Sequence, residues 1–95
     1  MKTQRFNSVW DAIEDTPEEA ANMKARSALI IAMTEHIKRL GLTQAQAAAR
    51  LGVTQPRISD LMRGKIDLFS LDMLVNMVAA AGLRVNLDVQ EDAKA

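Results

Sequence analysis

The sequence contains no cysteine and a single histidine, His36. Without cysteine the chain forms neither disulfide bonds nor thiolate metal sites, and one histidine does not make a metal cluster. Aromatic residues are only 3% of the chain, whereas hydrophobic residues are 48% and alanine is frequent. This balance favours closely packed helices over a sandwich of sheets. We therefore expect a mainly α fold with no metal, no cofactor and no catalytic residues.

Long hydrophobic runs are also missing. No run approaches the roughly 18 apolar residues of a membrane span, and the opening residues MKTQRFNSVW lack the continuous apolar region of a secretion signal. The 95 residues suit one compact domain. We expect a cytoplasmic protein that has no membrane partner.

Excess charge of one sign is absent from the chain as a whole, since twelve basic and twelve acidic residues cancel. The segment from Lys38 to Lys65, however, holds six basic residues and one acidic residue, Asp60, a net charge of +5. The remainder therefore carries −5. A local basic surface for a polyanionic partner is compatible with this neutral total.

Residues 16–82 carry helix start and stop signals. Thr16, Pro17 and Glu19 are typical of a helix start, and Gly41 is suited to end the helix in a left-handed conformation, which predicts a helix over 17–40. Its apolar stripe is expected to contain Leu29, Met33, Ile37 and Leu40. Three more helices are predicted over 44–51, 55–63 and from Ser70 to Gly82, with a loop at 65–69.

The two ends of the chain differ from this helical middle. Residues 1–15 show no clear periodicity and are interpreted as an N-terminal arm, in which Trp10 either packs on the protein's own core or anchors a partner. Residues 83–90 alternate apolar and polar side chains, which predicts a β-strand, and 91–95 are interpreted as a disordered tail.

A single strand needs a partner for its backbone N–H and C=O groups, and the sequence offers no second clear strand. Three partners remain open: the N-terminal segment, the same strand of a second protomer across a two-fold axis, or another protein. We favour the two-fold solution, which predicts a homodimer. The apolar residues of its dimerisation surface are Leu83, Val85, Leu87 and Val89.

The helices over 44–51 and 55–63 are joined by a short turn and must cross steeply. Such a crossing needs a small residue where the backbones approach, which Ala48 provides, and a residue that tolerates positive φ, which Gly52 provides. The apolar anchors are Val53, Ile58 and Leu61. Together these features predict a helix-turn-helix over 43–64.

The segment TQAQAAARLGVTQPRISDLMRGK, Thr43 to Lys65, resembles the helix-turn-helix of the phage-repressor-like (XRE or Cro/CI) family. With the long preceding helix, the phrase IDLFSLDMLVNMVAAAGL and the terminal strand, the whole chain is similar to HigA-like antitoxins and their stand-alone regulator relatives. This resemblance implies a lambda-repressor-like bundle of about four to five helices with one C-terminal strand. It also implies that helix 55–63 lies in the DNA major groove.

Helix 55–63 carries side chains that are able to read bases. Gln55 suits adenine, Arg57 suits guanine, Asp60 accepts from cytosine N4, and Pro56 offers only apolar contact. The better-known phage repressors carry amide side chains at the positions of Pro56 and Asp60, so their specificity does not transfer. An alternative for Asp60 is an ion pair with a neighbouring arginine, either Arg57 or Arg63.

Other residues suit contacts to phosphate. In the family, Gln44 matches a residue that contacts phosphate at a helix start, and Arg63 and Lys65 follow the reading helix as cations. The complete set of expected DNA contacts is Gln44, Thr54, Gln55, Pro56, Arg57, Ser59, Asp60, Arg63 and Lys65.

Two functional hypotheses follow. The first is a homodimeric, sequence-specific transcriptional regulator that binds double-stranded DNA at a palindromic operator and represses its own promoter. The alternative is an antitoxin whose main role is to bind and neutralise a toxin protein, through the arm, Trp10 or the long helix.

Overall fold

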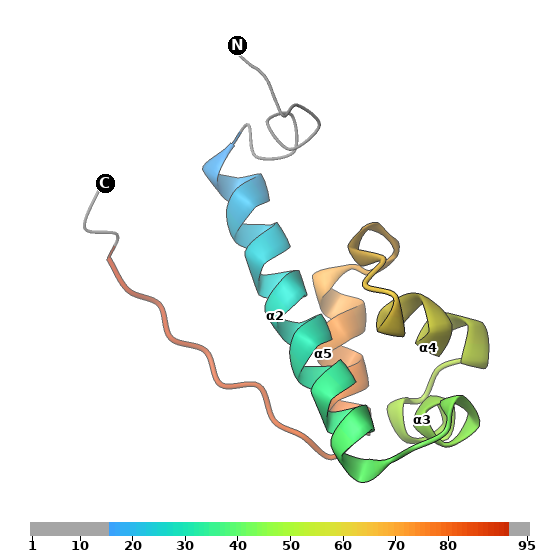
Figure 1. Ribbon diagram of the computed structural model, residues 1–95. Coiled ribbons are helices and arrows are strands. Elements are labelled where there is room, and N and C mark those ends of the chain that lie inside the picture. The colour runs from blue at the N-terminus through green and yellow to red at the C-terminus, as the bar shows by residue number, and fades with distance from the viewer. Residues whose placement is uncertain (1–15, 92–95) are drawn as a thin grey trace.

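Four α-helices and one 3-10 helix follow one another within residues 16–91 (Figure 1). The computed structural model describes residues 16–91. The helices are α2 (Pro17–Leu40), α3 (Gln44–Leu51), α4 (Gln55–Met62), η1 (Ile66–Leu68) and α5 (Leu71–Ala80). The predicted mainly α fold is confirmed. The predicted arm with Trp10, and all but the first residue of the predicted tail, lie outside the described residues.

Helix α2 begins and ends where its capping residues predict. The Thr16 hydroxyl accepts a hydrogen bond from the Glu19 amide at 3.0 Å, and Pro17 occupies the first turn, where an N–H group would have no helical partner. Gly41 ends the helix at φ 64°. Acidic residues in the first turn and basic residues in the last oppose the helix dipole; they are Glu18, Glu19, Lys38 and Arg39.

Two of the later helices end slightly earlier than predicted. α4 ends at Met62 and is followed by Arg63 as its cap, whose amide still donates to the Ser59 carbonyl at 3.1 Å. α5 ends at Ala80 because the chain turns before Gly82, whose φ is 81°. Frayed ends of this kind shift helix bounds by one or two residues and leave the architecture unchanged.

The core forms where α2 packs along α5 and α3 and α4 pack against this pair. α2 contributes Ile30, Met33 and Ile37, whereas Leu29 is half-buried and Leu40 is 45% exposed. The predicted stripe was thus wrong at Leu40, the last residue before the chain turns away. The largest fully buried side chains are Phe69, Met33, Leu51, Ile58, Leu61 and Leu74.

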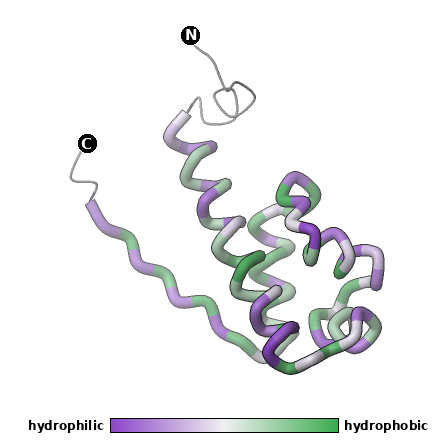
Figure 2. The backbone as a smooth tube through the Cα atoms, viewed as in Figure 1, coloured by the Kyte–Doolittle hydropathy of each residue, from purple (hydrophilic) through white to green (hydrophobic). Residues whose placement is uncertain are grey.

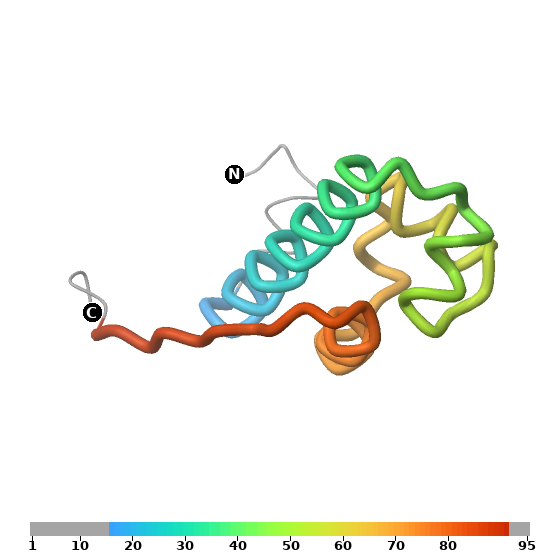
Figure 3. The backbone as a smooth tube through the Cα atoms, turned by 90° about the horizontal axis from the view of Figure 1, so that it is seen from below, coloured from blue at the N-terminus to red at the C-terminus, as the bar shows by residue number. Residues whose placement is uncertain are grey.

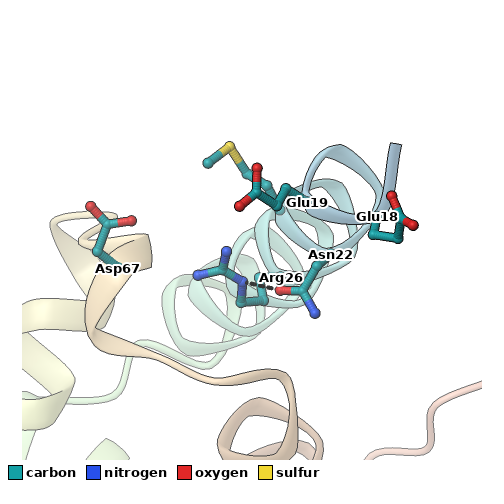
Figure 4. A pocket seen from close by; sticks show the side chains of 6 residues that line it. Glu18, Glu19, Asn22, Arg26 and Asp67 are labelled. Carbon is teal, nitrogen blue, oxygen red and sulfur yellow. Dashed lines mark hydrogen bonds between the residues drawn. The ribbon is translucent and has the colours of Figure 1, made fainter. Parts of the chain in front are cut away.

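Residues 65–69 were predicted to be a loop, but they contain the 3-10 helix η1. Arg26 of α2 holds this turn, because its guanidinium donates to the Ile66 carbonyl at 3.0 Å and to the Phe69 carbonyl at 3.4 Å. Its Nε also donates to Asn22 Oδ1 at 2.6 Å, at the edge of an open hollow (Figure 4). Because the charged Arg26 guanidinium bonds two carbonyl groups, it attaches the η1 connection to α2.

The predicted C-terminal strand over 83–90 does not form within the described chain. Residues 83–91 are extended and alternate in hydropathy (Figure 2), but a strand also needs ladder hydrogen bonds, and no described segment pairs with them. The Leu83 amide donates to the Val78 carbonyl at 3.1 Å, the last backbone bond to the helical body. Leu83 and Val85 pack against the core, whereas Leu87 and Val89 are 88% and 95% exposed.

The regions predicted to bind DNA and to form the dimer lie apart. The α3–α4 pair lies on one side of α2, and residues 83–91 run back along the other side (Figures 1 and 3). None of the helices within residues 16–91 is long and apolar enough to cross a membrane.

Candidate nucleic-acid interface

The α3–α4 pair is shaped by a capping box and one left-handed glycine. The Thr43 hydroxyl accepts from the Gln46 amide at 3.1 Å, and the Gln46 side chain accepts from the Thr43 amide at 2.9 Å. Gly52 ends α3 at φ 70°, and the Val53 amide donates to the Ala48 carbonyl at 3.0 Å. The chain therefore reverses within a few residues, as the predicted helix-turn-helix requires.

Helix α4 has one buried face and an exposed N-terminal tip. Ile58 and Leu61 are 0% exposed, and Ala47 of α3 is equally buried. Gln55 and Pro56 form the first turn of α4 and are exposed. A helix that is anchored by two fully buried side chains presents this tip in a fixed direction.

Arg57 has contacts that the sequence analysis missed. Its Nη1 donates to the Leu68 carbonyl at 3.0 Å, and the guanidinium lies 5.3 Å from the centre of the Phe69 ring. Both partners belong to the segment after α4, so Arg57 joins the candidate reading helix to the η1 turn. The only sequence signal was an arginine and an aromatic residue separated by eleven other residues, which does not predict a contact.

Asp60 lies close to Arg63, one of the two arginines named as its alternative partners. Asp60 Oδ1 is 3.7 Å from Arg63 Nη2, and the Arg63 Nε donates to the Ser59 carbonyl at 3.5 Å. The two side chains are 23% and 61% exposed, for Asp60 and Arg63 respectively. At this length and exposure the pair is weak, so it restrains Arg63 without removing either group from solvent.

The other predicted contacts, apart from Ser59 in the middle of α4, lie at or beside the ends of these helices. Gln44 is the first residue of α3 and Lys65 precedes η1, and both are exposed. Thr54 is exposed, but its hydroxyl caps α4 by accepting from the Arg57 amide at 3.3 Å. Ser59 is half-buried. The nine predicted DNA contacts thus lie on α3, α4 and the residues that flank α4.

Within residues 16–91, no three histidine, cysteine, aspartate or glutamate side chains are grouped to hold a metal ion. His36 is half-buried, with its Nδ1 3.2 Å from Arg39 Nη2. Its Nε2 atom is buried and has no hydrogen-bond partner in the described chain.

Two short helices that cross at a left-handed glycine, with buried anchors and an exposed tip, define a helix-turn-helix protein, a class that presents its second helix to the major groove of DNA. Residues 12–90 match the model of a family described as helix-turn-helix domain, and the chain belongs to this family. No curated protein matches the sequence. A solved structure named XRE family transcriptional regulator shares 31% identity and a TM-score of 0.71, over 81% of this chain and 86% of that one.

Proposed function

We propose that this protein is a sequence-specific transcriptional regulator that binds a palindromic DNA operator as a homodimer and represses its own promoter. The exposed tip of α4 on two fully buried anchors, Ile58 and Leu61, carries the proposal. The name of the solved structure, XRE family transcriptional regulator, supports the same class. The HigA-like resemblance of the sequence supports an autorepressor.

The base contacts are assigned to the first turn of α4. Gln55 is exposed and has both an amide donor and a carbonyl acceptor, which suits the N6 and N7 groups of adenine. Pro56, beside it, suits a thymine methyl group. Arg57 keeps guanidinium donors beyond the Nη1 group that bonds the Leu68 carbonyl, and these reach toward guanine.

Phosphate contacts are assigned to the flanks of α4. Gln44 at the start of α3 combines an amide side chain with the helix N-terminus, and Lys65 is an exposed cation. Arg63 is 61% exposed beside Asp60 and serves the same role. Asp60 retains a second carboxylate oxygen for cytosine N4.

The dimer is needed because one eight-residue reading helix makes few base contacts. Two copies place two α4 helices in successive major grooves about 34 Å apart, which predicts an operator with two-fold symmetry. The apolar side chains of residues 83–89 are assigned to the contact between the copies.

Selection of bound duplexes from random DNA tests this proposal directly. We expect a palindromic consensus whose half-sites lie one helical turn apart, bound by a sedimenting dimer. Gln55→Ala is expected to relax the preference at one base pair of each half-site, a loss of about 1–3 kcal/mol of discrimination. The control, Lys24→Ala on α2, should leave the consensus unchanged. A monomer with and without the duplex, or no consensus, would contradict the proposal.

A second candidate role is binding of a toxin protein, and exposed apolar residues of α2 favour it. Ile31 is 56% exposed and Leu40 is 45% exposed. An interface built on such residues persists at salt concentrations that release operator DNA. We expect a toxin to co-purify at high salt with the wild-type chain and not with Ile31→Asp, while Lys24→Asp retains it. Equal recovery with both variants would exclude this surface.

A further inference from the structure

We infer that residues 83–89 form an antiparallel two-stranded sheet with the same residues of a second copy, with Asn86 facing its own counterpart and Arg84 facing Asp88 of the partner subunit. This inference rests on the homodimer proposed above and specifies its register. It explains why an alternating segment is extended but unpaired in the single chain.

The apolar side chains at the end of this segment are exposed to water and would be shielded by a partner. Leu87 and Val89 are the most exposed large apolar side chains in residues 16–91, at 88% and 95%. Leu83 and Val85, on the same face of the extended chain, already pack against the core. Beyond the Leu83 amide, the described segment up to residue 91 makes no backbone hydrogen bond to the helices. A second strand would bury these apolar side chains and would also supply hydrogen-bond partners for the unpaired backbone N–H and C=O groups.

The apolar pattern selects the register. Residues that stand directly opposite each other in paired strands point to the same face of the sheet, so the apolar faces of the two strands coincide only if apolar residues stand opposite apolar residues. With Asn86 opposite itself, Leu83 stands opposite the partner's Val89, and Val85 opposite the partner's Leu87. A shift that centres the pair on Val85 places Val89 opposite the helix cap Ala81, and one that centres it on Leu87 places Leu83 opposite the partner's Glu91. Only the Asn86 register pairs all four apolar residues with one another.

Charge complementarity selects the same register independently. When Asn86 faces itself, Arg84 and Asp88 of the partner subunit are directly opposite on the polar face, and the two-fold axis repeats this pair. Arg84 and Asp88 are both exposed. Asp88 Oδ2 already accepts from Gln90 Nε2 at 2.7 Å, which leaves its other oxygen for the guanidinium.

An apolar groove receives the partner's side chains. It lies between α2, α5 and the extended segment, and it is lined by Ala25, Ala28, Leu29, Leu71, Val75, Val85, Asn86 and Leu87. Val75 at its edge is 38% exposed. In the Asn86 register the partner's Leu87 stands beside Val85, on the face of the strand that points to these helices. The groove is thus filled by a second copy of this chain.

Charge reversal tests the pairing. Arg84→Asp and Asp88→Arg each create two repulsive pairs, so each variant alone should dimerise roughly tenfold or more weakly. An equimolar mixture restores two attractive pairs, and native mass spectrometry should show mainly the heterodimer. Arg50→Asp, an equal charge change on α3, should dimerise like the wild type. Unaltered dimers of both single variants, or a mixture that forms no heterodimer in excess, would overturn the register.

Cysteine cross-linking tests the register without changing charge. The chain has no cysteine, so Asn86→Cys introduces one thiol per copy. Directly opposite residues have Cα atoms about 4.5–5.5 Å apart, which fits a disulfide. Gln90→Cys, a control that also leaves the charge unchanged, places its two thiols about 26 Å apart along the strands. We expect Asn86→Cys to form a covalent dimer and Gln90→Cys to remain unlinked; the reverse result would overturn the register.

Failure of the register can be told apart from failure of the proposed function. If the charge variants stay dimeric and still bind the palindromic duplex, the homodimeric regulator stands and only the register is wrong. If the wild-type chain is a monomer both with and without the duplex, the proposed function fails as well.

Discussion

Arg57 combines a proposed base contact with two contacts inside the fold. Its position on the reading helix suggests a base contact, while its guanidinium bonds the Leu68 carbonyl at 3.0 Å and lies over the Phe69 ring. A charged donor to a carbonyl and a cation over an aromatic ring both stabilise the folded chain. Loss of DNA binding in an Arg57 variant therefore needs to be separated from loss of folding.

Arg57→Ala is expected to lower the free energy of unfolding by about 1–2 kcal/mol, because it removes both contacts to the segment after α4. Urea denaturation followed by circular dichroism measures this change. Arg50→Ala is the matched control, since Arg50 is exposed on α3. Equal stabilities of the two variants would show that the Arg57 contacts do not stabilise the fold.

The turn between α3 and α4 depends on one backbone conformation rather than on a crowded space. Gly52 has φ 70°, and an added Cβ would meet only the Ala80 Cβ at 3.7 Å, an ordinary contact. Gly41, after α2, has φ 64° and nothing within 4 Å. The two glycines therefore share the same conformational requirement, but only Gly52 sets how α4 leaves α3.

Gly52→Ala and Gly41→Ala are expected to lose similar amounts of stability, about 1–2 kcal/mol each, because both force a side chain into the left-handed region. Thermal unfolding of the two variants measures the loss. If Gly52→Ala were much less stable than Gly41→Ala, packing against Ala80 would have to be tighter than 3.7 Å implies.

Capping signals predicted the helices well because they act within one turn of chain. Thr16, Thr43, Thr54 and Ser70 each accept the amide hydrogen bond expected of a helix start. The η1 turn was missed because Arg26, which holds it, lies forty residues before Ile66. The predicted strand is not seen for a related reason: alternation identifies an extended segment, but a strand also needs ladder hydrogen bonds, and no segment within residues 16–91 supplies them.

In the candidate site, the sequence predicted which side chains of α4 are buried and which are exposed, but not all of their contacts. Burial of Ile58 and Leu61 and exposure of Gln55 follow from helical periodicity. The link from Arg57 to Phe69 depends on a tertiary distance, which periodicity does not supply. Arg57 and Arg63 each lie three residues from Asp60, so helical spacing alone does not choose Arg63 as its partner.

At the scale of the whole protein, a neutral total charge conceals a local excess of basic residues. The chain is neutral, yet the segment from Lys38 to Lys65 carries +5. At physiological salt, interactions beyond about 8 Å are largely screened. In the proposed complex the basic segment would therefore attract only phosphates in contact with it, and the neutral total charge does not argue against such contacts.

Lys65→Ala is expected to weaken binding to all duplexes alike and to reduce the slope of log affinity against log salt by about 1 for each copy bound. Fluorescence anisotropy at several salt concentrations measures this slope. Lys24→Ala, which removes the same charge from α2, should leave the slope unchanged. A loss confined to one operator sequence would instead assign Lys65 to base recognition.

The tip of α4 is held mainly by residues that are not proposed to touch bases, and Arg57 is the exception. Thr54 caps the helix, Ile58 and Leu61 anchor it, and Arg57 joins it to the next turn. Gln55 and Pro56, in contrast, are exposed and make none of these stabilising contacts. Substitutions at these two positions would change the preferred DNA sequence at little cost in folding, so copies of this gene could acquire new operators while keeping the same scaffold.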